Sequence, residues 1–102
     1  NNDEVQYDLA FTGAIKDEIM DIESLALKLI TKLQEIQPER LSARYKIESL
    51  SEDPLKNMDM IGKKRGAIIS GGEIDYNRIA VMLLDEFRGG KLGPISLEKP
   101  IN

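Results

Sequence analysis

The stretch DIESLALKLITKLQEI at residues 21–36 carries the pattern that decides the fold. Its apolar side chains recur at steps of three and four, which places them on one stripe of an α-helix. The stripe consists of Ile22, Leu25, Ala26, Leu29, Ile30, Leu33 and Ile36. Asp21 is a suitable N-cap, and Met20 and Leu25 have the spacing of a hydrophobic staple. We therefore predict a helix over residues 22–36 that buries one face in a core.

Two shorter helices are predicted on the C-terminal side of this segment. Pro38 suits the first position of a helix over residues 38–45. Asp53-Pro54 opens the next helix, for which Gly62 is a natural stop. The basic run Lys-Lys-Arg-Gly at residues 63–66 would then form a loop.

The last predicted helix begins after its N-cap Asp75 and ends at Gly89-Gly90. Its apolar face consists of Ile79, Met82, Leu83 and Phe87. Residues 91–102 contain two prolines and are expected to form an extended tail over the surface. The pattern predicts an all-α fold, a small four- to five-helix bundle with an extended C-terminal tail.

The N-terminal segment lacks the helical period. Residues 7–12, Tyr-Asp-Leu-Ala-Phe-Thr, alternate loosely, so we expect a short strand there. A lone strand is not stable, and its partners would have to lie outside this chain. Asn1 is also an unusual first residue. We therefore expect a fragment of a longer protein, with a domain edge and linker over residues 1–20 and a helical domain over residues 21–102.

Composition excludes several classes of protein and site. The chain has 102 residues, enough for one domain with a modest core, and it contains neither cysteine nor histidine. Disulfides, thiolate nucleophiles and zinc-thiolate sites are therefore excluded, and so are the commonest general base and transition-metal ligand. No apolar run approaches the roughly 20 residues that cross a bilayer, so no membrane partner is expected.

Signs of catalysis are weak. Adjacent acids such as Asp85/Glu86 point about 100° apart on a helix and do not converge on a substrate, so solvated surface charge is their more common role. Gly71-Gly72 precedes a helix N-terminus that could face an anion, but Glu73 and Asp75 oppose this. The sequence has no P-loop and no nucleophile elbow. We predict no catalytic residue, cofactor site or metal site in this chain, which we do not expect to be an enzyme.

The net charge of −4 is unevenly distributed. Residues 1–25 carry a net −6, whereas residues 26–102 carry a net +2. Phosphate contacts need lysine and arginine. The acidic total therefore excludes a uniformly basic nucleic-acid binder, but the mildly basic part after residue 25 leaves an RNA partner open.

Basic residues after residue 39 are candidates for contacts with phosphate. They are Lys63, Lys64, Arg65, Arg78, Arg88, Lys91, Arg40 and Arg44. A solvated face is the ordinary role of such residues, and this alternative stays open. If the basic run and the last helix converge, they form a surface that contacts phosphates without base specificity.

Five short motifs occur in order along the chain. They are LAFTGAIKD at residues 9–17, RYKI at 44–47, IGKKRG at 61–66, GGEID at 71–75 and FRGGKLG at 87–93. Together they resemble the ribosome biogenesis GTPase A family, the YlqF-like, circularly permuted GTPases. The first motif is similar to the end of the GTPase core, and the other four are similar to the C-terminal domain.

The resemblance implies that this chain is the helical C-terminal domain of a bacterial, cytoplasmic GTPase that assists late assembly of the large (50S) ribosomal subunit. In that family a separate GTPase domain binds GTP and Mg²⁺, and its motifs would precede Asn1. The implied partners are ribosomal RNA of the large-subunit precursor and the protein's own GTPase domain. Residues 1–20 would then be the edge of that domain and a linker.

The role in RNA contact carries over by resemblance to the cations inside matching motifs. These are Lys63, Lys64, Arg65, Arg88 and Lys91, whereas Arg40, Arg44 and Arg78 follow only from charge. An alternative from another class also stays open. It is a protein–protein interaction module without RNA binding, whose acidic first helix binds a partner or the GTPase domain.

Overall fold

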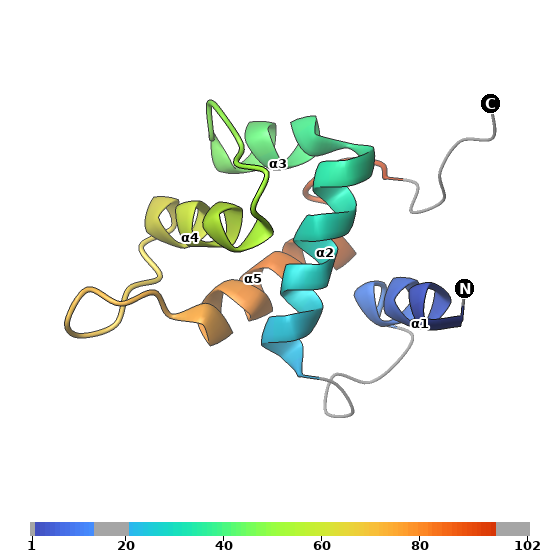
Figure 1. Cartoon of the computed structure of the whole chain (residues 1–102), viewed down its shortest axis with the longest axis horizontal. Helices are drawn as coiled ribbons and strands as arrows, with labels where there is room; N and C mark the ends of the chain where they lie inside the picture. The colour runs from blue at the N-terminus through green and yellow to red at the C-terminus, as the bar shows by residue number, and fades with distance from the viewer. Residues whose placement is uncertain (1, 14–20, 96–102) are drawn as a thin grey trace.

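The computed structural model describes residues 2–13 and 21–95, which contain five helices (Figure 1). In chain order they are α1 (Asn2–Phe11), α2 (Ile22–Ile36), α3 (Pro38–Tyr45), α4 (Pro54–Lys64) and α5 (Tyr76–Arg88). Extended pairing within the described residues is limited to one isolated antiparallel bridge between Ile68 and Ile74. The prediction of a small all-α bundle is confirmed.

Helix α2 is the central element, and the other helices pack around it (Figure 1). Both of its ends lie where the sequence predicts them. Asp21 caps the N-terminus by accepting hydrogen bonds from the Glu23 N–H at 3.1 Å and the Ser24 hydroxyl at 2.8 Å. Met20, the first residue of the predicted staple, lies outside the described residues.

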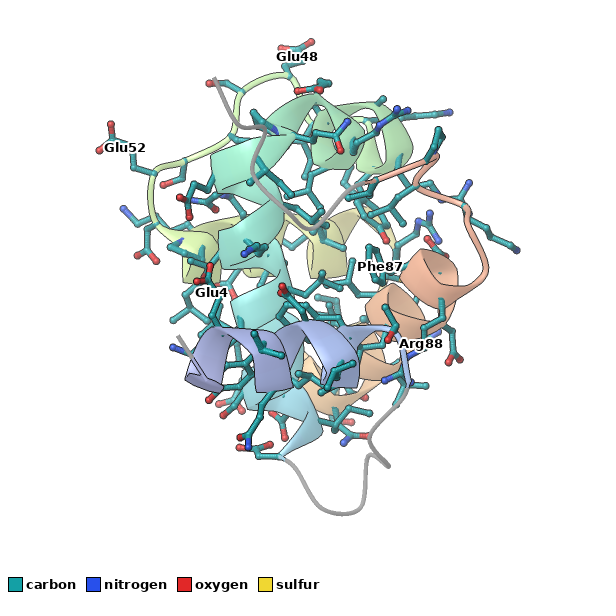
Figure 2. The ribbon with its side chains drawn as sticks, turned by 90° about the vertical axis from the view of Figure 1, so that its right-hand side faces the viewer. Glu4, Glu48, Glu52, Phe87 and Arg88 are labelled. Atoms are coloured by element: carbon teal, nitrogen blue, oxygen red, sulfur yellow. The ribbon has the colours of Figure 1, made fainter. Side chains whose placement is uncertain are left out.

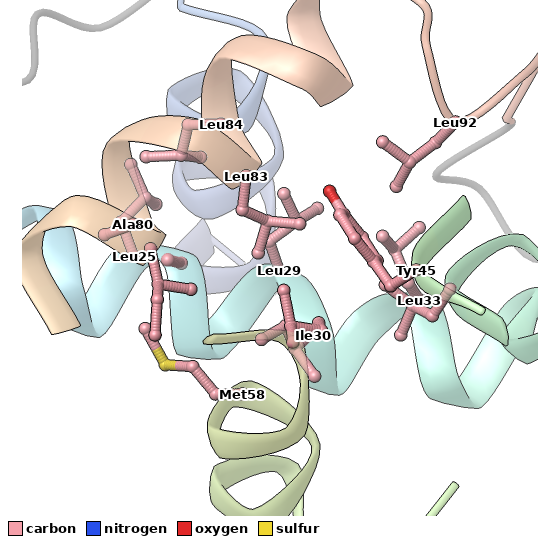
Figure 3. Close-up of a cluster of buried hydrophobic side chains, with 14 of the residues drawn as sticks. Leu25, Leu29, Ile30, Leu33, Tyr45, Met58, Ala80, Leu83, Leu84 and Leu92 are labelled. Carbon is pink, nitrogen blue, oxygen red and sulfur yellow. The ribbon is translucent and has the colours of Figure 1, made fainter. Parts of the chain in front are cut away.

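The core forms where the α2 stripe meets side chains from the other helices (Figure 3). Leu29 and Leu33 of α2 are fully buried, and Tyr45 of α3 lies against them. Helix α4 contributes Met58 and Ile61, and helix α5 contributes Ile79, Ala80, Leu83 and Leu84. Burial of these side chains is the main force that holds the short helices in place, since isolated helices of this length are marginal in water.

Gly62 does not stop α4 as predicted, and the helix continues to Lys64. The glycine is buried, and a Cβ atom there would collide with Cδ1 of Ile79 on α5. It therefore permits close contact between two helices, a role that only their packing reveals. As a result, Lys63 and Lys64 lie in the last helical turn rather than in a loop, and the chain turns at Gly66, whose φ is +68°.

The strand prediction for residues 7–12 is wrong, because residues 2–11 form α1. Tyr7, Ala10 and Phe11 have the i, i+3, i+4 spacing of a helical face, which buries Ala10 and Phe11 in the core. A helix satisfies its backbone hydrogen bonds internally, whereas a strand would need a partner. Lys32 also pairs with Glu4 at 2.7 Å and anchors α1 to α2.

Two other expectations fall partly beyond the described residues. The C-terminal tail is described to Ile95, and within it Leu92 is buried against the core. Residues 96–102 lie outside the described part, and so do residues 14–20, which would contain the linker. The division of the chain at residue 20 stays a prediction.

Candidate nucleic-acid interface

Three helices end in basic residues. The last turns of α3, α4 and α5 contain Arg44, the pair Lys63 and Lys64, and Arg88. A cation at a helix C-terminus is stabilised by the partial negative charge of the unpaired carbonyls. This local effect explains part of the basic pattern without any ligand, so the contacts of each side chain decide its role.

Two of the predicted phosphate contacts, Arg44 and Arg65, bind Glu86 of α5. Nε of Arg44 donates to Oε1 at 3.0 Å, and Nη1 of Arg65 donates to Oε2 at 2.8 Å. The hydroxyl of Tyr45 also donates to Oε1 at 3.0 Å. Arg65 additionally lies over the Tyr45 ring, with 5.0 Å from its guanidinium carbon to the ring centroid. The cluster ties the ends of α3 and α4 to α5.

The cluster changes the protonation of two of its members. Burial raises the pKa of Glu86, but the hydrogen bonds from Arg44, Arg65 and Tyr45 outweigh it and leave this pKa below its ordinary value. Burial, together with the adjacent Glu86 carboxylate, raises the pKa of the Tyr45 hydroxyl. Glu86 is therefore ionised and Tyr45 is neutral near neutral pH, which is the pairing that the hydrogen bonds require.

Glu86 was expected among the solvated surface charges, and this prediction is wrong. The side chain of Glu86 is only 13% exposed, whereas its neighbour Asp85 is exposed. One signal in the sequence points to this difference. Glu86 lies one turn after Met82 and beside Phe87, so it borders the apolar face of α5, whereas Asp85 lies away from it.

Arg88 holds α1 against the end of α5 (Figure 2). Its Nε donates to the Phe11 carbonyl at 3.0 Å, and its Nη2 donates to the Ala10 carbonyl at 2.9 Å. These carbonyls belong to the last turn of α1, where backbone acceptors lack partners within the helix. The guanidinium of Arg88 therefore caps another helix.

Four of the eight predicted residues keep exposed charged groups. Lys63, Lys64, Lys91 and Arg78 are exposed, and none of them forms an ion pair within the described part of the chain. Arg78 makes one long contact, 3.5 Å from Nη1 to the Gly66 carbonyl, just beyond the end of α4. Arg40 is half-buried, and its guanidinium packs against Gly93.

The structure thus brings part of the predicted surface together. Arg65 and Arg78 both lie near the end of α4, since Arg65 reaches Met82 and Glu86 while Arg78 reaches Gly66. Arg44 joins them through Glu86. Among residues 2–13 and 21–95, no group of acidic side chains could hold a metal ion, and no helix is long and apolar enough to cross a membrane.

Comparison with known proteins finds relatives among ribosome biogenesis GTPases and nucleolar GTP-binding proteins, although no family model matches. The chain is 42% identical over 92 residues to ribosome biogenesis GTPase A of Bacillus cereus, which covers 90% of this chain and 31% of the relative. Identity to the Bacillus licheniformis protein of the same name is 44%, again over 90% of this chain and 32% of the relative. Nucleolar GTP-binding protein 2 of Neurospora crassa is 25% identical over 90% of this chain and 14% of that protein.

The chain spans about a third of the length of the bacterial relatives that it matches. Such coverage is consistent with one domain of a longer protein, as the resemblance of the motifs implies. The recognition made from the five motifs is confirmed: over nine-tenths of its length, this chain is a homologue of the ribosome biogenesis GTPase A proteins.

Proposed function

We propose that this chain is the helical C-terminal domain of a GTPase that assists late assembly of the large (50S) ribosomal subunit, and that it docks that protein on ribosomal RNA. The observation that carries the proposal is the match to ribosome biogenesis GTPase A over 90% of the chain. The parent protein would be cytoplasmic and would bind GTP and Mg²⁺ in a separate GTPase domain.

The exposed cations near the end of α4 and after α5 supply the contacts with RNA in this proposal. Lys63, Lys64, Arg78 and Lys91 are exposed and can exchange bound water and counterions for phosphate oxygens. Arg44 and Arg65 contribute positive potential while they position the ends of α3 and α4 through Glu86. Because these contacts are to the backbone, docking would depend on the shape of the RNA rather than its base sequence.

A salt titration of the full chain against bacterial large-subunit precursor particles tests this proposal. The Lys63→Ala/Lys64→Ala variant should bind more weakly, and its plot of log affinity against log salt should be shallower by about two units. Lys28→Ala removes an exposed lysine beside Tyr7 of α1 and is the control, with little change expected. If the affinity and the salt slope of the double variant are unchanged, Lys63 and Lys64 do not contact the RNA.

The protein-interaction alternative is favoured by one feature of α1. Val5 and Leu9 lie one turn apart and are 57% and 45% exposed, so an apolar strip faces outward. In this alternative the strip contacts the GTPase domain or another protein. Val5→Ser/Leu9→Ser should then abolish association with particles, while Lys63→Ala/Lys64→Ala should leave it intact. The reverse result supports RNA docking.

A further inference from the structure

A groove runs between the segment that joins α3 to α4 and the outer face of α4. Its first part encloses about 550 Å³ and is lined by Lys46, Glu48, Met60, Lys63 and Lys64, among others. A second part of about 400 Å³ shares Met60 and Lys63 with the first and extends it to Lys56 and Asp59. Because the two parts share lining residues, they form one continuous depression, which we call the lysine groove.

The lysine groove has an excess of positive charge. Four lysines (Lys46, Lys56, Lys63 and Lys64) and two acids (Glu48 and Asp59) line it, for a net charge of +2. Asp59 accepts a hydrogen bond from the Tyr76 hydroxyl at 2.6 Å, which engages one of its oxygens with α5. The four lysines form no ion pair within the described residues. Such a groove attracts an anionic ligand.

Both walls of the groove are fixed by buried contacts. On the connecting segment, Ile47 is only 6% exposed, and the Ser51 N–H donates to Oδ1 of the fully buried Asn57 at 2.7 Å. The amide of Asn57 in turn donates to the Ser51 carbonyl at 2.9 Å and to Oε1 of Gln34 at 2.7 Å. The segment is therefore held against α4 before any ligand binds, which lowers the entropic cost of binding.

The spacing of the lysines along α4 fits a nucleic-acid strand. Lys56, Met60 and Lys63 are at i, i+4 and i+7, so they lie on one stripe of the helix. Seven residues of α-helix rise about 10 Å. Successive phosphates of one nucleic-acid strand are closer together than this, so Lys56 and Lys63 can contact different phosphates of the same strand. Met60 is half-buried between the lysines and offers an apolar floor on which a ribose can pack.

We propose that the lysine groove binds the sugar-phosphate backbone of one ribosomal RNA strand, with Lys46 on one wall and Lys56, Lys63 and Lys64 on the other. The proposal rests on the function proposed above and adds to it Lys46 and Lys56, two residues outside the predicted set. It also assigns the RNA a path along the outer face of α4, rather than across α5. The groove contains no aromatic side chain, so the contact does not distinguish bases.

The test is a salt titration of the full chain against purified large-subunit ribosomal RNA. The variant is Lys46→Asn/Lys56→Ala, because Lys46 has a φ of 56° and asparagine tolerates this left-handed conformation better than alanine. Loss of two phosphate contacts should reduce the salt slope by about two units. Between 50 and 200 mM salt, the wild-type affinity should then fall about 16-fold more than that of the variant.

Three single variants sharpen the test. Glu48→Gln removes an acid from the groove and should strengthen RNA binding, whereas Glu23→Gln removes an exposed acid of α2 and should leave it unchanged. Lys28→Ala is the control for loss of a lysine elsewhere. Circular dichroism melts of the groove variants should overlay the wild-type melt, which shows that binding rather than folding has changed.

The outcomes separate the two proposals. In one outcome the wild-type chain binds the RNA, Lys63→Ala/Lys64→Ala weakens binding, and Lys46→Asn/Lys56→Ala does not. This result would overturn RNA binding in the lysine groove but would leave the proposed function standing. If the wild-type chain does not bind the RNA, both are overturned. Polyglutamate is a further competitor. If it displaces the RNA at equal charge concentration, the RNA assignment of the lysine groove is overturned, because the groove would then be a site for acidic peptides.

Discussion

At the scale of single residues, Glu86 organises the positive side of the molecule. Its carboxylate accepts hydrogen bonds from Arg44, Arg65 and Tyr45, three side chains on or next to the ends of two other helices. Without it, two guanidinium groups about one-third exposed would lie close together with no counter-charge. The carboxylate of Glu86 thus stabilises two neighbouring cations that would otherwise repel each other.

Replacement of Glu86 tests this role. Glu86→Ala should lower the free energy of unfolding by about 2–3 kcal/mol, since it leaves hydrogen-bond donors unpaired and removes a charge pair that is only partly screened. Urea denaturation monitored by circular dichroism measures the change. Asp85→Ala, at the exposed neighbouring position, should stay within about 0.5 kcal/mol of wild type. Equal stability of the two variants would contradict the role assigned to Glu86.

The lowered pKa of Glu86 also predicts a dependence of stability on pH. The unfolded chain has a Glu86 pKa near its ordinary value of 4.5, and the folded chain has a lower one. Between these values the unfolded state binds more protons, so the contribution of Glu86 is fully present above about pH 4.5 and is lost as pH falls through the folded pKa. Urea midpoints measured from pH 6 to pH 2.5 should therefore decline less steeply for Glu86→Gln than for wild type. Parallel curves would show that Glu86 does not titrate in this way.

At the scale of elements, the contact between α4 and α5 depends on Gly62. The glycine has no side chain, and Ile79 of α5 fills the space where a Cβ atom would lie. Ile79 is fully buried, so it cannot move aside without disturbing the core. This contact sets how closely α4 approaches α5, and the exposed side of α4 carries the lysine groove.

A substitution at Gly62 separates helix propensity from packing. On propensity alone, Gly62→Ala would stabilise α4 by about 1 kcal/mol. We expect instead a loss of about 1–2 kcal/mol, because the added methyl overpacks the contact with Ile79. Thermal and urea unfolding measure this loss. Ile79→Val removes the colliding Cδ1 atom, so the double variant should lose less than the sum of the two single losses. Strict additivity would mean that the two side chains do not compete for space.

At the scale of the whole molecule, Arg88 joins the two ends of the described chain. It is separated from Phe11 by 77 positions in sequence, yet donates to the Phe11 carbonyl at 3.0 Å. Helix α1 is short, and its own composition gives it no strong amphipathic pattern. Its place on the bundle therefore depends on Phe11 in the core, the ion pair of Glu4 with Lys32, and this cap.

Loss of the cap should loosen α1 selectively. In Arg88→Met the amides of α1 should lose about tenfold or more in hydrogen-exchange protection, while those of α2 and α5 change little. The methionine keeps the apolar stem in place, so the change reports the guanidinium. Arg78→Met is the matched control on the same helix, since Arg78 is exposed and its side chain makes one long hydrogen bond within the described residues. A uniform loss of protection across all helices would contradict a local role for Arg88.

The sequence by itself determined the helices that are specified by residues close together along the chain. The stripe of α2, its Asp21 cap, Pro38 at the start of α3 and the Asp75 cap of α5 all act within one or two turns, so they could be read from neighbouring residues. The family was also recognisable, since five short motifs keep their order along the chain.

Only the tertiary structure decided the features that depend on residues distant in sequence. The local pattern of residues 7–12 indicates a strand, but burial of Ala10 and Phe11 in the core favours a helix. Gly62 has the local character of a helix stop, but its role is to make room for Ile79 of α5. The same holds for the basic residues. A lysine or arginine has the same charge wherever it lies, and its role depends on whether a carboxylate or a helix end from elsewhere in the chain lies within hydrogen-bond distance.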